Sequence, residues 1–75
     1  MGTPETPPTF QPERLVAIRC ERGLRQKDLA QATGRTPGAV GRLETGDLVP
    51  SRDWLEEIAK VLHVRVGDLL AEAAS

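Results

Sequence analysis

The sequence predicts an all-α fold, in which a compact five-helix domain follows a disordered N-terminal tail. Three observations support this fold class. Apolar residues recur at spacings of three and four, which is the period of a helix with one buried face. Prolines and glycines stand where such helices would begin and end. The chain also lacks the strict apolar–polar alternation that is typical of a half-buried strand.

Length and composition exclude several classes of protein. With 75 residues the chain has room for one domain, and its 28% of charged residues is ordinary for a soluble globular protein. No apolar run approaches the roughly 20 residues that span a bilayer, and the N-terminus has no signal-peptide pattern. The single cysteine, Cys20, allows no internal disulfide, which agrees with a reducing compartment. We therefore expect a cytoplasmic protein that does not contact a membrane.

Residues 1–11 are expected to form a flexible, proline-rich tail, and residues 12–75 the folded domain. The tail holds three prolines but only one large apolar residue, Phe10, so burial cannot offset the entropy of ordering it. Pro12 suits the first position of a helix, where its missing N–H costs nothing. Phe10 and Leu15 would then be spaced as a hydrophobic staple.

The first two helices are short. The first covers residues 12–22 and ends at Gly23, because glycine adopts the left-handed conformation that closes a helix. The second covers about residues 26–32. The inward-facing apolar residues of these two helices are Leu15, Ile18, Leu29 and Ala30.

The third helix has the most distinct boundaries. Thr36 is its N-cap, Pro37 is its first residue, and Gly46 closes it. Val40 and Leu43, three residues apart, face inward.

A fourth helix is capped by Ser51 and stopped by His63, which we expect in a left-handed conformation. A metal-ligand role for His63 is disfavoured because the chain has no second histidine. A short fifth helix follows, whose leucines cover the domain's own core or pair with a second copy. The apolar residues of these two helices are Leu55, Ile58, Ala59, Leu62, Val66, Leu69 and Leu70.

Charge is distributed unevenly along the chain. The formal net charge is −1, yet residues 12–46 carry +3 and residues 47–75 carry −3. One part of the domain could therefore face a polyanion while the other faces away. The alternative is a chance asymmetry of a small domain.

The second and third helices meet the requirements of a helix-turn-helix unit, which needs two short helices joined by a tight turn. Ala30 offers a small side chain where the helices cross. Gly34 tolerates a positive φ in the turn. Val40 and Leu43 supply the inward face of the second helix of the unit.

Residues 14–70 resemble the Cro/repressor-type helix-turn-helix family, also called the xenobiotic-response-element family. The resemblance covers about three quarters of the chain. It is carried by an ordered set of residues, namely Arg14-Leu15, Ile18-Arg19, Arg22-Gly23-Leu24, Gln26, Leu29-Ala30, Gly34, Val40, Leu43-Glu44, Gly46, Pro50-Ser51, Leu55, Ile58-Ala59-Lys60, Leu62 and Asp68-Leu69-Leu70.

The resemblance implies that the third helix, about residues 36–45, enters the major groove of double-stranded DNA, with the protein bound as a homodimer and without a cofactor. By position, Gln26 would donate to a phosphate, and Glu44 would fix the chain after the third helix. The face toward the base edges would carry Thr36, Pro37, Gly38, Gly41 and Arg42. The residues close enough to contact the DNA backbone would be Arg25, Lys27 and Arg52.

Two arginines depart from the family pattern. Arg25 stands where the family places a Ser or Thr cap. Arg35 stands in the turn, where the family buries Val, Leu or Ile. Its side chain either extends into water or, as we favour, reaches a phosphate.

The predicted reading face is poor in hydrogen-bonding groups. Pro37, Gly38 and Gly41 carry no side-chain donor or acceptor. Arg42 is therefore the main candidate for base readout, because it can bond guanine O6 and N7, although it could instead touch only phosphate. Thr36 could add a hydroxyl contact, and the shape of the DNA could supply part of the specificity.

Trp54 lies beside the inward stripe of the fourth helix and has two interpretations. It either anchors a dimer or partner contact, or packs beneath the tail or the loop before its helix. We favour packing.

Together these features predict a sequence-selective DNA-binding transcriptional regulator, a repressor rather than an enzyme. No nucleophile–base pair or metal cluster is visible in the sequence. The alternative is a protein-interaction module on the same fold, such as an antitoxin or a co-regulator, that grips a protein partner with the third helix and Trp54.

Overall fold

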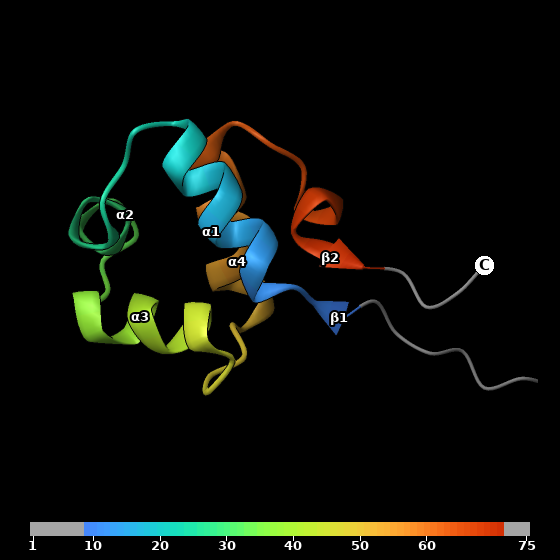
Figure 1. The fold of residues 1–75 in the computed structure, drawn as a ribbon, viewed down its shortest axis with the longest axis horizontal. Helices are drawn as coiled ribbons and strands as arrows, with labels where there is room; N and C mark the ends of the chain where they lie inside the picture. Colours follow the sequence, from blue (N-terminus) through green and yellow to red (C-terminus); the bar gives the residue numbers. More distant parts are fainter. Residues whose placement is uncertain (1–8, 72–75) are drawn as a thin grey trace, which may run out of the picture.

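The computed structural model describes residues 9–71, and the predicted all-α class is confirmed (Figure 1). The elements in chain order are β1 (Thr9–Phe10), α1 (Pro12–Glu21), α2 (Gln26–Ala32), α3 (Pro37–Thr45), α4 (Arg52–Leu62), the 3₁₀ helix η1 (Val66–Leu69) and β2 (Leu70–Ala71). Figure 1 shows α2 and α3 on one side of the molecule and the two short strands on the other.

The predicted helix boundaries are confirmed where side chains cap the helices. Thr36 Oγ1 accepts a hydrogen bond from Ala39 N at 3.2 Å, and Pro37 opens α3. Ser51 Oγ accepts from Trp54 N at 3.2 Å and starts α4. Each bond satisfies an N–H that the first turn of a helix leaves without a partner.

The two strands join the beginning and the end of the described chain. They pair antiparallel, with Phe10 opposite Leu70. Gln11 N donates to Leu69 O at 2.9 Å, and the guanidinium of Arg14 donates to Leu70 O at 2.9 Å. Together these bonds hold the end of the chain on the first turn of α1.

Residues 9–11 thus belong to the folded part, although the sequence assigned them to the tail. A two-residue strand is too short to show alternation, and Phe10 finds its partners about 60 positions away, which a local pattern does not reveal. The rest of the predicted tail, residues 1–8, lies outside the described residues.

The fifth predicted helix is a single 3₁₀ turn rather than an α-helix. Asp68 Oδ2 accepts from Arg65 N at 3.0 Å and caps it. Leu70 then turns into extended backbone with φ −118°. Four residues are a typical length for a 3₁₀ helix, whose hydrogen-bond geometry does not support long runs.

One apolar core unites the helices. Leu69 is fully buried in it, so this leucine covers the domain's own core, while Ile18, Val66 and Leu70 are half-buried. Phe10 is half-buried against the same cluster. Burial of one leucine side chain contributes roughly 2 kcal/mol to folding. The core residues are Leu15, Leu29, Ala30, Val40, Leu43, Trp54, Leu55, Ile58, Ala59, Leu62 and Leu69.

None of the helices within residues 9–71 combines the length and the apolar character that crossing a bilayer requires.

Left-handed residues end α3 and α4 and yield a paired prediction. His63 has φ 59°, which costs a residue with a Cβ about 1 kcal/mol, whereas Gly46 has φ 88° without that cost. We expect His63→Gly to raise the free energy of unfolding in urea by about 1 kcal/mol and Gly46→Ala to lower it by at least as much. A destabilised His63→Gly variant would contradict this account.

Candidate nucleic-acid interface

The helix-turn-helix unit consists of α2, the turn of residues 33–36, and α3. Gly34 has φ 69°, as the sequence predicts for this turn. Arg35 N donates to Ala30 O at 2.8 Å, and Thr33 Oγ1 donates to Leu29 O at 2.9 Å. The turn is thus tied to the last residues of α2, and this fixes the direction in which α3 leaves it.

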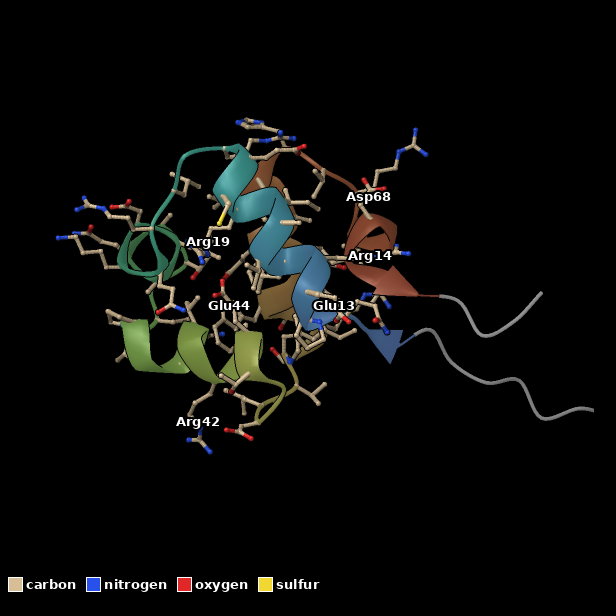
Figure 2. The ribbon with its side chains drawn as sticks, in the orientation of Figure 1. Glu13, Arg14, Arg19, Arg42, Glu44 and Asp68 are labelled. Carbon is tan, nitrogen blue, oxygen red and sulfur yellow. The ribbon has the colours of Figure 1, made fainter. Side chains whose placement is uncertain are left out.

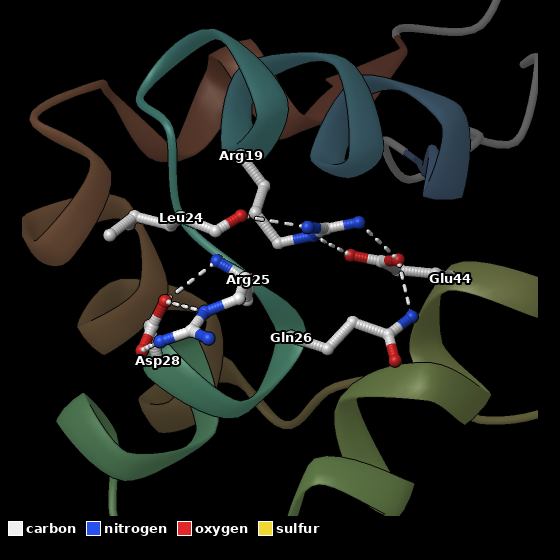
Figure 3. A network of polar contacts seen from close by, with 6 residues as sticks. All are labelled: Arg19, Leu24, Arg25, Gln26, Asp28 and Glu44. Atoms are coloured by element: carbon white, nitrogen blue, oxygen red, sulfur yellow. Dashed lines mark hydrogen bonds and ion pairs between the residues drawn. The ribbon is translucent and has the colours of Figure 1, made fainter.

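A partly buried ion pair connects α1 with the end of α3 (Figure 3). Arg19 Nε donates to Glu44 Oε2 at 2.6 Å, and Arg19 Nη2 donates to Glu44 Oε1 at 3.1 Å. Arg19 Nη1 also donates to Leu24 O at 2.8 Å, in the segment before α2. The side chains of Arg19 and Glu44 are only 13% and 6% exposed. The hydrogen bond that Arg19 donates to Glu44 is the main cause that raises the pKa of Arg19.

Gln26 is the first residue of α2 and joins this network. Its Nε2 donates to Glu44 Oε1 at 2.9 Å, so the carboxamide is held between α2 and α3 (Figure 3). Glu44 thus contacts α1 and α2. Its role is structural, as predicted, but it holds α3 against these two helices rather than fixing the chain after α3. Gln26 is exposed, and its second amide hydrogen remains free for the predicted phosphate contact.

The start of α2 is capped differently from the family pattern. Arg25 supplies no capping oxygen, but Asp28 Oδ2 accepts from Arg25 N at 2.9 Å and from Arg25 Nε at 3.1 Å. The backbone hydrogen bond from Arg25, followed by that from its side chain, lowers the pKa of Asp28. The guanidinium of Arg25 therefore lies against a carboxylate rather than free in solvent (Figure 3).

The outer face of α3 is open to solvent. In Figure 2 the Arg42 side chain points away from the body of the molecule, whereas Arg19 and Glu44 point toward each other inside it. Thr36, Pro37 and Gly38 are exposed, like Arg42.

The two glycines of α3 have no packing requirement inside the protein. A Cβ at Gly38 would meet no atom within 4 Å, and one at Gly41 would meet only the Gln26 carboxamide, at an ordinary 3.7 Å. Each glycine nevertheless weakens a helix interior by about 1 kcal/mol relative to alanine. The described part of the protein thus gives no reason for glycine at either position.

The basic side chains fall into two groups. The first group bonds to carbonyl or carboxylate oxygens of the protein and comprises Arg14, Arg19, Arg22, Arg25 and Arg52, the last through an exposed pair with Glu56 at 3.2 Å. The second group makes no hydrogen bond or ion pair with the residues that the structure describes, and comprises Lys27, Arg35, Arg42, Lys60 and Arg65. Three members of the second group lie in the helix-turn-helix unit.

Trp54 is buried and 5% exposed, so it packs within the domain and its use as an exposed partner anchor is wrong. Its contacts are with the turn after α2 rather than, as the sequence suggested, with the tail or the loop before α4. Its Nε1 donates to Thr33 Oγ1 at 3.3 Å, and the Arg35 guanidinium lies over its ring, 4.9 Å from the centroid. The sequence did not reveal this contact. The sequence feature that could have indicated the contact is an arginine at a turn position where the family has an apolar residue, together with an aromatic residue at the start of α4.

Cys20 is exposed on α1. Within residues 9–71, no three His, Cys, Asp or Glu side chains are grouped so that they could hold a metal ion.

This fold and this open helix face define a helix-turn-helix domain. A comparison with known families agrees, since the family described as "Helix-turn-helix domain" matches residues 13–73. The chain belongs to this family.

A curated relative is the HTH-type transcriptional regulator DdrOP3 of Deinococcus deserti, which is 41% identical over 58 residues. The match covers 77% of this chain but 45% of the relative. The chain therefore spans about half the length of that regulator.

Solved structures share the arrangement of helices. The clp gene regulator ClgR of Corynebacterium glutamicum has a TM-score of 0.74 at 28% identity, over 77% of this chain and 62% of that one. The P22 c2 repressor in complex with a synthetic operator has a TM-score of 0.77 at 26% identity, over 83% of this chain and 94% of that one. The hydroxypropylphosphonic acid epoxidase of S. wedmorenis also matches, at 30% identity and a TM-score of 0.76, but over only 34% of the enzyme. Its likeness extends to the helix-turn-helix part alone.

The Arg19–Glu44 pair yields a stability prediction. Glu44→Gln should lower the free energy of unfolding by about 3 kcal/mol, because it leaves a largely buried guanidinium without its counter-charge. The matched control is Arg52→Gln, which removes an exposed pair and should change stability by less than about 0.5 kcal/mol. Urea unfolding followed by circular dichroism measures both variants. Equal effects would contradict the central role of the buried pair.

Proposed function

We infer that this protein is a sequence-selective DNA-binding transcriptional regulator of the repressor type, acting in the cytoplasm. The observation that carries this proposal is the exposed outer face of α3, where the Arg42 side chain projects into solvent and has no hydrogen-bond or ion-pair partner among residues 9–71 (Figure 2). Lys27 and Arg35 add unpaired positive charge on the same helix-turn-helix unit. Membership of the helix-turn-helix family and the likeness to regulators support the proposal.

In the proposed complex α3 lies in the major groove. Arg42 donates two hydrogen bonds to guanine O6 and N7, a pairing worth about 1–3 kcal/mol of discrimination against another base. Gly38 and Gly41 allow the helix backbone to come close to the base edges. Thr36 offers a hydroxyl, and Pro37 an apolar contact for a thymine methyl group.

Phosphate contacts hold α3 in register. Gln26 donates its free amide hydrogen to one phosphate. Arg25 and Arg52 reach the backbone after they leave their carboxylate partners, which costs little because both pairs are exposed. Release of condensed counterions makes the affinity fall steeply with salt.

The proposed active form is a homodimer. Two-fold related copies would place two α3 helices in successive major grooves, about 34 Å apart, on a palindromic operator. The P22 c2 repressor, similar over 83% of this chain, was solved in complex with a synthetic operator, which supports DNA as the partner.

The first test is selection of bound duplexes from a random-sequence pool at about 150 mM salt, where non-specific attraction is damped. We expect a palindrome with half-sites one helical turn apart. On the selected duplex, Arg42→Ala should weaken binding by about 1–3 kcal/mol and relax the preference at one base pair. An unchanged affinity would remove the reading role from Arg42. A pool without enrichment would favour a protein-interaction module instead.

The glycines of α3 give a second test in which stability and binding move in opposite directions. Gly38→Ala should raise the free energy of unfolding by about 1 kcal/mol, because its Cβ meets open space. The same Cβ should lower affinity for the selected duplex, because DNA needs that space. The control is Gly67→Ala in η1, where a Cβ also meets no atom within 4 Å but DNA is not expected. Unchanged binding by Gly38→Ala would contradict the close approach.

A further inference from the structure

A hollow opens between α2 and the first turn of α3. It has a volume of about 380 Å³ and is lined by Lys27, Gln31, Arg35 and Pro37. All four residues are exposed, so the hollow faces solvent. Two of its four lining residues are cationic and none is acidic. The chemistry of the lining therefore suits a small anionic group.

The two cations of this hollow are unpaired. Neither the Lys27 nor the Arg35 side chain makes a hydrogen bond or ion pair with a described residue, whereas Arg25, the residue before α2, is bonded to Asp28. Glu44, the other carboxylate of the helix-turn-helix unit, does not pair with them either, because it is bonded to Arg19. The positive charge of the hollow is thus available to an external group.

The Arg35 side chain is held in place by Trp54. The guanidinium carbon lies 4.9 Å from the centroid of the buried indole, in the range of a cation–π contact. The indole is in turn fixed, because its Nε1 donates to Thr33 Oγ1 at 3.3 Å. A guanidinium that packs on a ring through its face keeps its N–H donors free at its edge. The stack therefore reduces the entropy that Arg35 loses on binding, without using its donors.

We propose that this hollow is a phosphate-binding subsite for the DNA backbone, in which Lys27 and Arg35 contact one phosphodiester group and Trp54 is the positioning residue for Arg35. The inference rests on the proposed function, because it assumes that α3 lies in the major groove. Pro37, the first residue of α3, forms one wall of the hollow. The phosphate that occupies it belongs to the strand that borders the groove beside the N-terminal end of α3.

A backbone phosphate accepts a two-pronged contact of this kind. Arginine donates two parallel hydrogen bonds to phosphate oxygens, and lysine adds a point charge from the other side. Such a contact holds the helix in register without reading sequence. The subsite should therefore contribute equally to the binding of cognate and random duplexes.

The test is a salt series with fluorescently labelled duplexes of selected and random sequence. Each phosphate contact contributes about 0.9 to the slope of log affinity against log salt. Lys27→Gln and Arg35→Gln should together lower the magnitude of that slope by about 1 and weaken both duplexes by a similar factor. The control is Lys60→Gln, which removes an equally exposed and unpaired charge from α4 and should leave the slope unchanged.

Two outcomes separate this proposal from the one on which it rests. A parent protein that binds neither duplex overturns the proposed function and the subsite together. A parent that binds, but with an equal loss of slope in Lys60→Gln and in the double variant, overturns the subsite alone, because the effect is then one of net charge.

A double-mutant cycle tests the positioning role of Trp54. Trp54→Leu keeps an apolar side chain but removes the stack, and should weaken duplex binding by about two- to fivefold, after correction for the folded fraction. In the Arg35→Gln background the same change should cause no further loss, because Trp54 then has no guanidinium to hold. Additive losses would show that Trp54 affects binding independently of Arg35 and would overturn its positioning role.

Discussion

The ion pair between Arg19 and Glu44 is the contact on which the position of α3 depends. It joins the last turn of α1 to the last turn of α3, and it reaches the segment before α2 through Leu24 and the first residue of α2 through Gln26. Two long side chains that are largely withdrawn from water hold their geometry only while both charges are present. The pair therefore fixes the orientation of the helix-turn-helix unit relative to α1.

Some charged side chains are paired within the protein and others are not, and this explains how a chain with net charge −1 can present a basic face. Carboxylates that lie near the unit are used internally, since Glu44 binds Arg19 and Asp28 binds Arg25. The remaining acidic residues of the second half are placed mostly on α4 and beyond it. Among residues 9–71, no carboxylate forms an ion pair with Lys27, Arg35 or Arg42. The formal net charge is the sum of the paired and the unpaired charges, so it does not reveal this arrangement.

The sequence predicted the helices well because their ends are set by local chemistry. Thr36 and Ser51 cap their helices, and Gly34, Gly46 and His63 take the left-handed conformation expected of them. These features depend on a few neighbouring residues, so a local pattern reveals them.

Features that depend on distant partners were not predicted. The pairing of Phe10 with Leu70 and the stacking of Arg35 on Trp54 join residues 60 and 19 positions apart. Trp54 shows why a local sequence pattern is not enough to predict the contacts around the site. Its place beside the apolar stripe suggested partial exposure, but Thr33 offers its indole N–H an acceptor and Arg35 covers its ring, so burial carries no unpaired donor. The positions of the proposed DNA contacts come from the family resemblance, but which cations are free to make them is a property of the fold.

The most direct test of the account is an amide NMR titration of the protein with the selected duplex. We predict that the shift changes concentrate on α2, on residues 35–42 and around Arg52, and that they spare residues 57–62 of α4. Changes that centre on α4 or on the β1–β2 ribbon, with α3 unaffected, would contradict the claim that the outer face of α3 is the DNA-binding surface.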